Sequence, residues 1–333
     1  MYGHVMSPTP PVPALVPTVA DELFADGAAH GRSLALVVQH RGQVCFERYG
    51  TLPDTAFGPG GAVGPDTTLV SWSMAKSITQ AAVGIAVGDG ALVVDAPAPV
   101  AAWRGTEKEA IRLLDLLEMR SGLEFVEDYV DDSVSHCIDM LFGSGQDDMA
   151  AYAAALPLLH TPGSVWNYSS GTTNIISRIL GDAVAPTRAA MEAFLAERLF
   201  GPVGMTSAIP KFDGRGTFVG SSFVYATARD FARFGQWYLD DGVVAGRRLL
   251  PEGWCEHART QIARDDESDI GYGRQWWLMP ELPGSMTAQG YEGQYTLVDP
   301  EHDLVVVHLG KVPADTRAPL RQAIVAIARA FDD

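Results

Sequence analysis

The chain has 333 residues, of which 47% are hydrophobic and 20% are charged, and its formal net charge is -17 at pH 7. This composition is typical of a folded globular protein, and the excess of acidic residues excludes nucleic acid and anionic membranes as expected partners, because both attract basic surfaces. Cys45, Cys137 and Cys255 lie far apart and are odd in number, so we interpret them as reduced thiols of a cytoplasmic protein.

The first residues are rich in proline and lack the basic and apolar regions of a signal peptide. We expect residues 1–16 to form an extended arm, followed by a first helix near Val19 to Gly27. No apolar run approaches the roughly 20 residues that cross a bilayer. The histidines and cysteines show no ligand spacing, so neither a metal nor a cofactor is predicted.

Strand patterns occur near both ends of the chain. The segment SLALVVQHRGQVCFERYG predicts a hairpin that turns at Gly42. Near the other end, QYTLVD and LVVVHLG predict two strands joined by PEHD, and APLRQAIVAIARAF predicts a closing helix. Between Ser73 and about Met205 the apolar spacing is mostly helical. A further helix is predicted from Tyr225 to Leu239.

This order predicts an α+β fold in which one antiparallel sheet, flanked by helices in three layers, is built from both ends of the chain. Residues 17–72 and 206–333 would form the sheet lobe. Residues 73–205 would form an inserted all-helical lobe that carries the Ser73 helix.

The segment VSWSMAKSITQAAVGIAVGDG places Ser73 and Lys76 one helical turn apart. Residues i and i+3 share a helix face, so the two side chains point into the same space. A serine hydroxyl needs a neighbouring base to become a nucleophile, and apolar surroundings favour the neutral form of a lysine. The alternative is a helix cap at Ser73 and a surface lysine at Lys76.

Tyr168 lies in HTPGSVWNYSSGTTNIISRIL, after a Pro-Gly turn and before a helix that is predicted to start near Gly171. A tyrosine held at such a loop can pass a proton between a nucleophile and a leaving group. The alternative is a packed aromatic residue whose hydroxyl bonds the backbone.

Three motifs in this order, S-M-A-K, P-G-S-x-W-x-Y-S-S and G-Y-E-G-Q, resemble those of the serine β-lactamase and penicillin-binding superfamily. The similarity is greatest to its class C-like branch of esterases and 6-aminohexanoate-dimer hydrolases, and it runs from about Ser33 to Gly310. It implies a β-lactamase/DD-peptidase-like fold and hydrolysis through an acyl-enzyme.

The resemblance also implies roles for individual residues. Ser73 would be the acylated nucleophile, Lys76 and Tyr168 would share the acid and base work, and the N–H groups of Ser73 and Gln294 would form the oxyanion hole. Substrate contacts are expected from the loop and motif residues Tyr129, Ser170, Tyr291, Glu292 and Gly293.

Two departures from the family bear on the substrate. The second motif reads Tyr168-Ser169-Ser170 where Tyr-x-Asn is common, and the third reads Tyr291-Glu292-Gly293 where lactamases have Lys-Thr-Gly. Glu292 would repel the carboxylate of a penicillin, so a dedicated β-lactamase is not expected.

The acidic segment LEFVEDYVDD is similar to the flap of the 6-aminohexanoate-dimer hydrolases. By that resemblance Tyr129 would cap the cleft and an acid would bind an ammonium group. The alternative is a solvated acidic loop, which is common in a chain with this charge. Trp166, Trp276 and Trp277 are candidates for the wall of an acyl pocket or for core packing.

These observations predict a serine hydrolase that acts on esters or small amides resembling 6-aminohexanoate oligomers. One alternative is a binding or scaffold protein of the same fold with weak or no catalysis, and another is a D-amino-acid peptidase or β-lactamase-like enzyme. The expected partner is a small ester or amide, and a homodimer is one assembly open to the chain.

Overall fold

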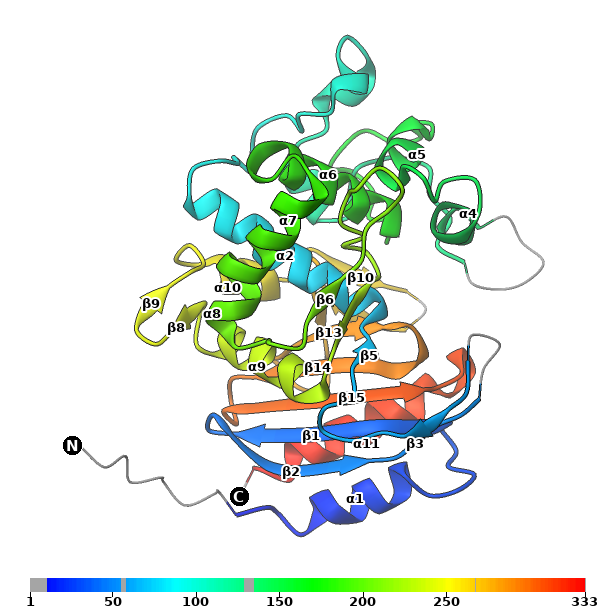
Figure 1. Ribbon diagram of the computed structural model, residues 1–333, viewed down its shortest axis with the longest axis vertical. Helices are drawn as coiled ribbons and strands as arrows, with labels where there is room; N and C mark the ends of the chain where they lie inside the picture. Colours follow the sequence, from blue (N-terminus) through cyan, green and yellow to red (C-terminus); the bar gives the residue numbers. More distant parts are fainter. Residues whose placement is uncertain (1–10, 55–57, 129–134, 267, 333) are drawn as a thin grey trace.

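The computed structural model describes residues 11–54, 58–128, 135–266 and 268–332. Its lower part in Figure 1 is an antiparallel sheet, and helices from the middle of the chain lie above that sheet. None of the helices in the described ranges combines the length and apolarity that a membrane crossing requires.

The main sheet is built from both ends of the chain, as the sequence predicted. Its eight strands follow the order β10-β11-β12-β13-β14-β15-β1-β2, with antiparallel neighbours. They are β1 (Arg32–His40), β2 (Gln43–Tyr49), β10 (Ala263–Asp265), β11 (Ile270–Tyr272), β12 (Trp277–Leu278), β13 (Met286–Gly290), β14 (Gln294–Asp299) and β15 (Leu304–Lys311). The N-terminal hairpin turns at Arg41 and Gly42, whose positive φ angles of 52° and 74° suit a tight two-residue turn.

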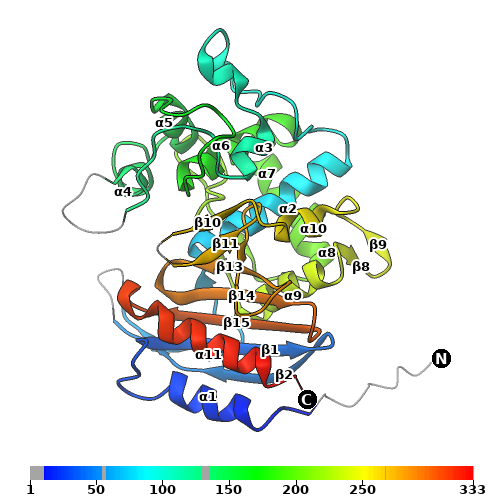
Figure 2. The same cartoon turned by 180° about the vertical axis from the view of Figure 1, so that it is seen from behind.

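Helices cover both faces of this sheet. Along β1, Leu36 and Val38 face one way and pack in a core with α1 (Leu15–Leu23) and α11 (Arg317–Arg329). Ala35 and Val37 face the other way and pack in a core that includes α9 (Ala228–Leu239). The alternation has the period of two that a strand imposes. Figure 2 shows α11 and α1 lying across the sheet on the side away from α9.

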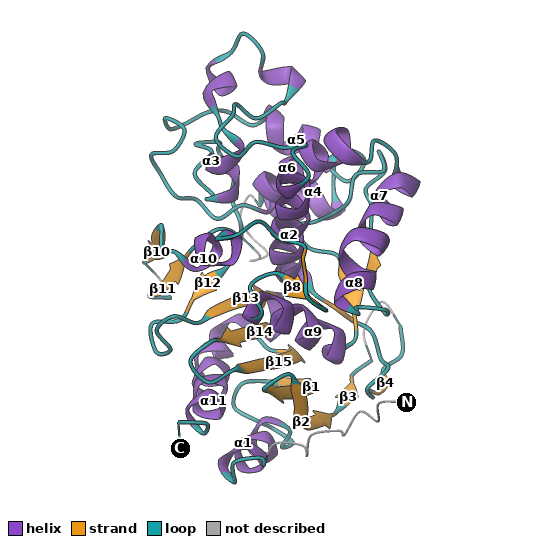
Figure 3. Ribbon diagram, turned by 90° about the vertical axis from the view of Figure 1, so that its left-hand side faces the viewer, coloured by secondary structure: helices purple, strands orange, loops and turns teal. Residues whose placement is uncertain are grey.

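The remaining helices surround α2 (Ala75–Gly88), which runs through the centre of the molecule (Figure 3). They are α3 (Leu113–Leu117), α4 (His136–Phe142), α5 (Met149–Ala155), α6 (Ser170–Val184), α7 (Arg188–Phe194), α8 (Gly201–Val203) and α10 (Trp254–Arg259). Short strands form the pairs β3 (Thr51–Leu52) with β4 (Gly61–Ala62) and β8 (Val243–Val244) with β9 (Arg247–Arg248). A third small sheet joins β5 (Leu69–Val70), β7 (Val224–Ala226) and β6 (Ile209–Pro210).

Several element boundaries differ from the sequence prediction. The first helix is Leu15–Leu23, earlier than expected, and the apolar run before Arg120 forms only the five-residue helix α3. The helix predicted from Tyr225 begins at Ala228, because Val224–Ala226 pairs as a strand and Thr227 caps the helix by accepting from the backbone N–H of Asp230. The division into lobes at residues 73 and 206 stays a prediction.

Candidate active site

Ser73 lies in a 3₁₀ turn, Trp72–Met74, that leads directly into α2. Trp72 has a φ of 43°, a left-handed conformation that is strained for a bulky residue. The backbone N–H of Ser71 donates to the carbonyl of Val224 at 2.8 Å, and the indole N–H of Trp72 donates to Glu292 at 3.0 Å. Ser73 is therefore presented on a turn that is fixed from both sides.

Lys76 is 2% exposed, and its ammonium group is surrounded by acceptors. Nζ donates to Ser73 Oγ at 2.9 Å, to Ser170 Oγ at 2.9 Å and to the carbonyl of Ser221 at 3.0 Å. These three partners satisfy the hydrogen-bonding capacity of Nζ, so the buried nitrogen is not left without partners. The alternative of a surface lysine is wrong.

Ser170 starts α6, and Ser169 caps that helix by accepting from the backbone N–H of Thr172 at 2.9 Å. The carboxylate of Glu127, which the sequence analysis placed in the acidic segment LEFVEDYVDD, also contacts Ser170. Glu127 accepts from the N–H of Ser170 at 2.7 Å and from Ser170 Oγ at 2.6 Å. The sequence carries no signal for this contact beyond the acidic character of the segment.

Tyr168 completes the group around the serine. Its ring lies 4.8 Å from Lys76 Nζ, and its hydroxyl interacts with the side chains of Ser73 and Lys76. Burial raises the pKa of Tyr168, while the positive charge of Lys76 lowers it and the negative charge of Glu127 raises it. The ring also packs against Trp277 and Tyr272, with centroids 5.2 Å and 5.9 Å away.

Two cavities of different character adjoin Ser73. One, of about 90 Å³, has mostly aromatic walls and includes the Arg317 side chain. It is lined by Ser73, Tyr168, Trp277, Gln289, Gly290, Tyr291, Tyr295 and Arg317. The other, of about 180 Å³, is mostly apolar; it is lined by Trp72, Ser73, Cys137, Ile138, Leu141, Phe142, Ser222 and Tyr291. Ser73 and Tyr291 line both cavities.

The aromatic cavity carries a positive charge. The Arg317 guanidinium lies 5.6 Å from the centre of the Tyr291 ring. No acceptor for Arg317 Nε is found among the described residues. A substrate anion could therefore be recognised at this end of the cleft.

The third sequence motif takes a different position from the expected one. Strand β13 ends at Gly290, where a Cβ atom would come within 2.4 Å of the Ser71 carbonyl, so the glycine allows the strand to approach the Ser73 turn. Gly293 has a φ of 79° and faces the side chains of Val312 and Leu320. The strand register beside Ser73 is therefore Ala288-Gln289-Gly290, three residues before the motif read from the sequence.

The positions of Gln294 and Glu292 follow from this register. Gln294 is 2% exposed and donates through Nε2 to the carbonyls of Tyr291, Glu292 and Gly310, and it lines neither cavity. Glu292 has a φ of 61°, and its carboxylate accepts from Lys311 Nζ at 2.6 Å as well as from Trp72. The Glu292 charge is therefore paired within the protein, and its repulsion of a substrate carboxylate stays a prediction.

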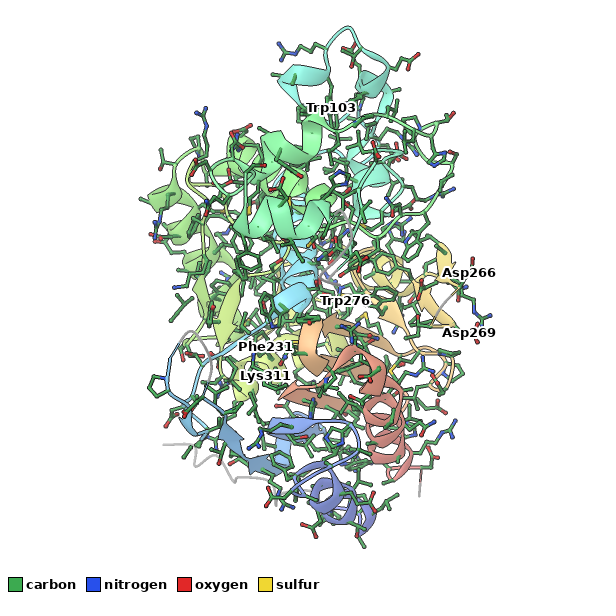
Figure 4. All side chains as sticks on the ribbon, turned by 90° about the vertical axis from the view of Figure 1, so that its right-hand side faces the viewer. Trp103, Phe231, Asp266, Asp269, Trp276 and Lys311 are labelled. Carbon is green, nitrogen blue, oxygen red and sulfur yellow. The ribbon has the colours of Figure 1, made fainter. Side chains whose placement is uncertain are left out.

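The tryptophans divide between site and core. Trp277 lines the aromatic cavity, and Trp166 packs against it at 6.1 Å. Trp276 is fully buried and stacks on Phe234, and Figure 4 shows it at mid-height beside α2. The predicted flap residue Tyr129, with Asp131 and Asp132, lies outside the described residues.

A serine and a buried lysine at a helix start, a tyrosine beside them and the end of an antiparallel strand together define the β-lactamase fold class of serine hydrolases. The chain matches the Beta-lactamase family over residues 20–328 and belongs to it.

Among its relatives, the 6-aminohexanoate-dimer hydrolase of Paenarthrobacter ureafaciens is 28% identical over 275 residues, which are 76% of this chain and 69% of that protein. Two solved structures share the fold. A Bacillus anthracis protein named as a candidate 6-aminohexanoate-dimer hydrolase has a TM-score of 0.76 and 23% identity, covering 94% of this chain and 82% of that one. A family VIII carboxylesterase has a TM-score of 0.70 and 16% identity, covering 96% and 99%.

Proposed function

We propose that this protein hydrolyses carboxylic esters and small amides through an acyl-enzyme formed on Ser73. The observation that carries the proposal is the 2.9 Å contact between the buried Lys76 Nζ and Ser73 Oγ, with Tyr168 beside both. A nucleophile within hydrogen-bonding reach of its base is the arrangement that covalent catalysis requires.

In the proposed reaction, Ser73 Oγ attacks the substrate carbonyl while its proton passes to the Lys76–Tyr168 pair. The same pair returns the proton to the departing alcohol or amine, which leaves an ester on Ser73. Water then attacks that ester, gives its proton to the pair and releases the acid, and Ser73 regains a proton.

The oxyanion of each tetrahedral intermediate needs two N–H donors. We assign them to the backbone of Ser73 and of Tyr291, in place of Gln294. Tyr291 follows the strand that abuts the Ser73 turn and lines both cavities, whereas Gln294 lines neither.

The two cavities favour a substrate with unlike ends. The apolar cavity, walled by Ile138, Leu141 and Phe142, fits an uncharged acyl group. The aromatic cavity with Arg317 fits a leaving group that carries an anion or a hydrogen-bond acceptor. The names of the relatives support this substrate range, since they include a 6-aminohexanoate-dimer hydrolase and a carboxylesterase.

The test is intact-mass analysis after reaction with a fluorophosphonate and, separately, with 4-nitrophenyl butyrate quenched in acid. The wild type should gain the mass of one adduct, mapped by peptide sequencing to Ser73, and Ser73→Ala should gain none. An adduct of equal yield in Ser73→Ala, or an unmodified wild type with no ester turnover, would refute the proposal.

A further inference from the structure

Glu127 forms one end of a continuous hydrogen-bonded path to the Ser73 hydroxyl. Its Oε1 accepts from Ser170 Oγ at 2.6 Å, Ser170 Oγ accepts from Lys76 Nζ at 2.9 Å, and Lys76 Nζ donates to Ser73 Oγ at 2.9 Å. Glu127 itself is three hydrogen bonds away from the serine and lines neither cavity. Its hydrogen-bonded route to the serine runs through Ser170 and Lys76.

The carboxylate determines which way the Ser170 hydroxyl points. An ionised carboxylate only accepts, so the single hydroxyl proton is directed to Glu127 and a lone pair is left for Lys76. The second oxygen, Oε2, accepts from the Ser170 backbone N–H at 2.7 Å and fixes the carboxylate at the start of α6. Without Glu127 the hydroxyl could rotate and compete with Lys76 as a donor.

The charges around the path are also specific. Lys76 is the cation at one end, and Tyr168 and Tyr272 are phenols whose raised pKa values include a contribution from the Glu127 charge. The Cys137 thiol lies 3.5 Å from Glu127 Oε1, Asp128 is the next residue, and His136 Nδ1 accepts from the N–H of Val126. The Glu127 charge therefore acts on Tyr168, the second member of the proton-transfer pair.

We infer that Glu127 is a positioning residue for the reaction: it orients Ser170 so that Lys76 is held on Ser73, and its negative charge sets the pH range in which the Lys76–Tyr168 pair takes the Ser73 proton. This inference rests on the proposed acyl-enzyme function. The competing explanation is that Glu127 only caps α6, where any acceptor at a helix N-terminus is favourable.

Three variants separate these explanations. Glu127→Gln keeps the size and an acceptor for the Ser170 N–H but removes the charge. Glu127→Asp keeps the charge but withdraws it by one methylene. Glu124→Gln, three residues earlier in the same segment and partly exposed, changes the net charge equally and is the matched control. The kcat/KM of each is measured from pH 5 to 10 on 4-nitrophenyl acetate, with thermal unfolding of each protein.

For Glu127→Gln we expect the ascending limb of the pH profile to move about one pH unit or more to lower pH, because the Glu127 charge helps to raise the pKa of Tyr168 and is lost in the variant. Its plateau kcat should fall about 10-fold with little change in KM, since the base is displaced rather than the substrate site. Glu127→Asp should lower the plateau and leave the limb in place. Glu124→Gln should match the wild type in both.

A second comparison uses Ser170→Ala, which cuts the path. Adding Glu127→Gln to Ser170→Ala should lower kcat/KM by a smaller factor than Glu127→Gln does in the wild type, because the effects of coupled residues are not additive. This pair keeps the inference testable if one single variant unfolds.

The inference is overturned if the ascending limb stays in place in Glu127→Gln and the effects of Glu127→Gln and Ser170→Ala are fully additive. Ser73-dependent turnover, and with it the proposed function, would still stand. A wild type without Ser73-dependent acylation would overturn the proposed function instead, and the inference with it.

Discussion

The two walls of the cleft around Ser73 fix their side chains in different ways. On the wall made by α2 and α6, Ser73, Lys76 and Ser170 are joined by hydrogen bonds that follow from helix geometry and a helix start. On the wall made by the β13–β14 turn, Glu292 is paired with Lys311, and Tyr291 lies at the cavities instead. A helical spacing leads directly to a contact, whereas a turn between strands can shift its register by a few residues and exchange every side chain at the site.

The largest expected effect tests the helical wall. Lys76→Met keeps the length and removes the amine, so kcat/KM for 4-nitrophenyl butyrate should fall about 10³-fold or more. Lys311→Met removes a different lysine, which is partly exposed and paired with Glu292, and this variant should retain activity within about threefold. Stopped-assay rates on both variants make the comparison. Equal losses would mean that the cleft responds to charge in general and that Lys76 has no special place.

Tyr168→Phe should lower kcat by about 10²-fold, because it removes only the hydroxyl that interacts with Ser73 and Lys76. Tyr272→Phe is the matched control. That ring packs edge-on to Tyr168 at 5.9 Å, and its hydroxyl has no hydrogen-bond partner among the described residues. Its kcat should stay within about twofold. If the two variants behave alike in steady-state kinetics, Tyr168 is only a packing residue.

The β13–β14 wall is tested with two acetate esters of equal size, 4-acetoxybenzoate and 4-acetoxybenzamide. Arg317→Gln should lower kcat/KM about 10-fold for the carboxylate ester, because that substrate loses one charged hydrogen bond. For the amide-bearing ester, kcat/KM should stay within about twofold of the wild type. The charge argument from Glu292 predicts that the wild type disfavours the carboxylate ester. If the wild type strongly disfavours 4-acetoxybenzoate and Arg317→Gln does so to the same degree, the charge of Glu292 and not that of Arg317 determines the selectivity.

The smallest effect is on stability. Glu292→Gln should lower the free energy of unfolding by about 1 kcal/mol, because its carboxylate accepts from both Lys311 and Trp72. It should give no gain for the carboxylate ester. Glu301→Gln, an exposed acid near the start of β15, should change the free energy by less than about 0.5 kcal/mol in the same urea titration. A gain in carboxylate turnover without loss of stability would contradict the ion pair.

The sequence was sufficient where local rules decide the structure. The hairpin at Gly42 and the strands QYTLVD and LVVVHLG are confirmed, because alternation and turn residues specify them. The proximity of Ser73 and Lys76 follows from an i,i+3 spacing.

Other features depend on contacts between distant segments and could not be read locally. Glu127 reaches Ser170 across 43 positions of chain. Both Gly290 and Gly293 fit the third motif by sequence, and only the packing of Gly290 on Ser71 distinguishes them. The apolar cavity likewise draws Trp72, Phe142 and Ser222 from three separate elements.

The pairing of β1 with β15 has a consequence for how the chain folds during synthesis. Arg32 pairs with Lys311, so β1 can join the rest of the sheet only after Lys311 has left the ribosome. Until then the apolar residues of β1 have neither β15 nor α11 to cover them. Contacts of such long range slow folding and expose strand edges to other chains. Truncation before β15 should therefore give an aggregating product, and slower translation should not help it to fold.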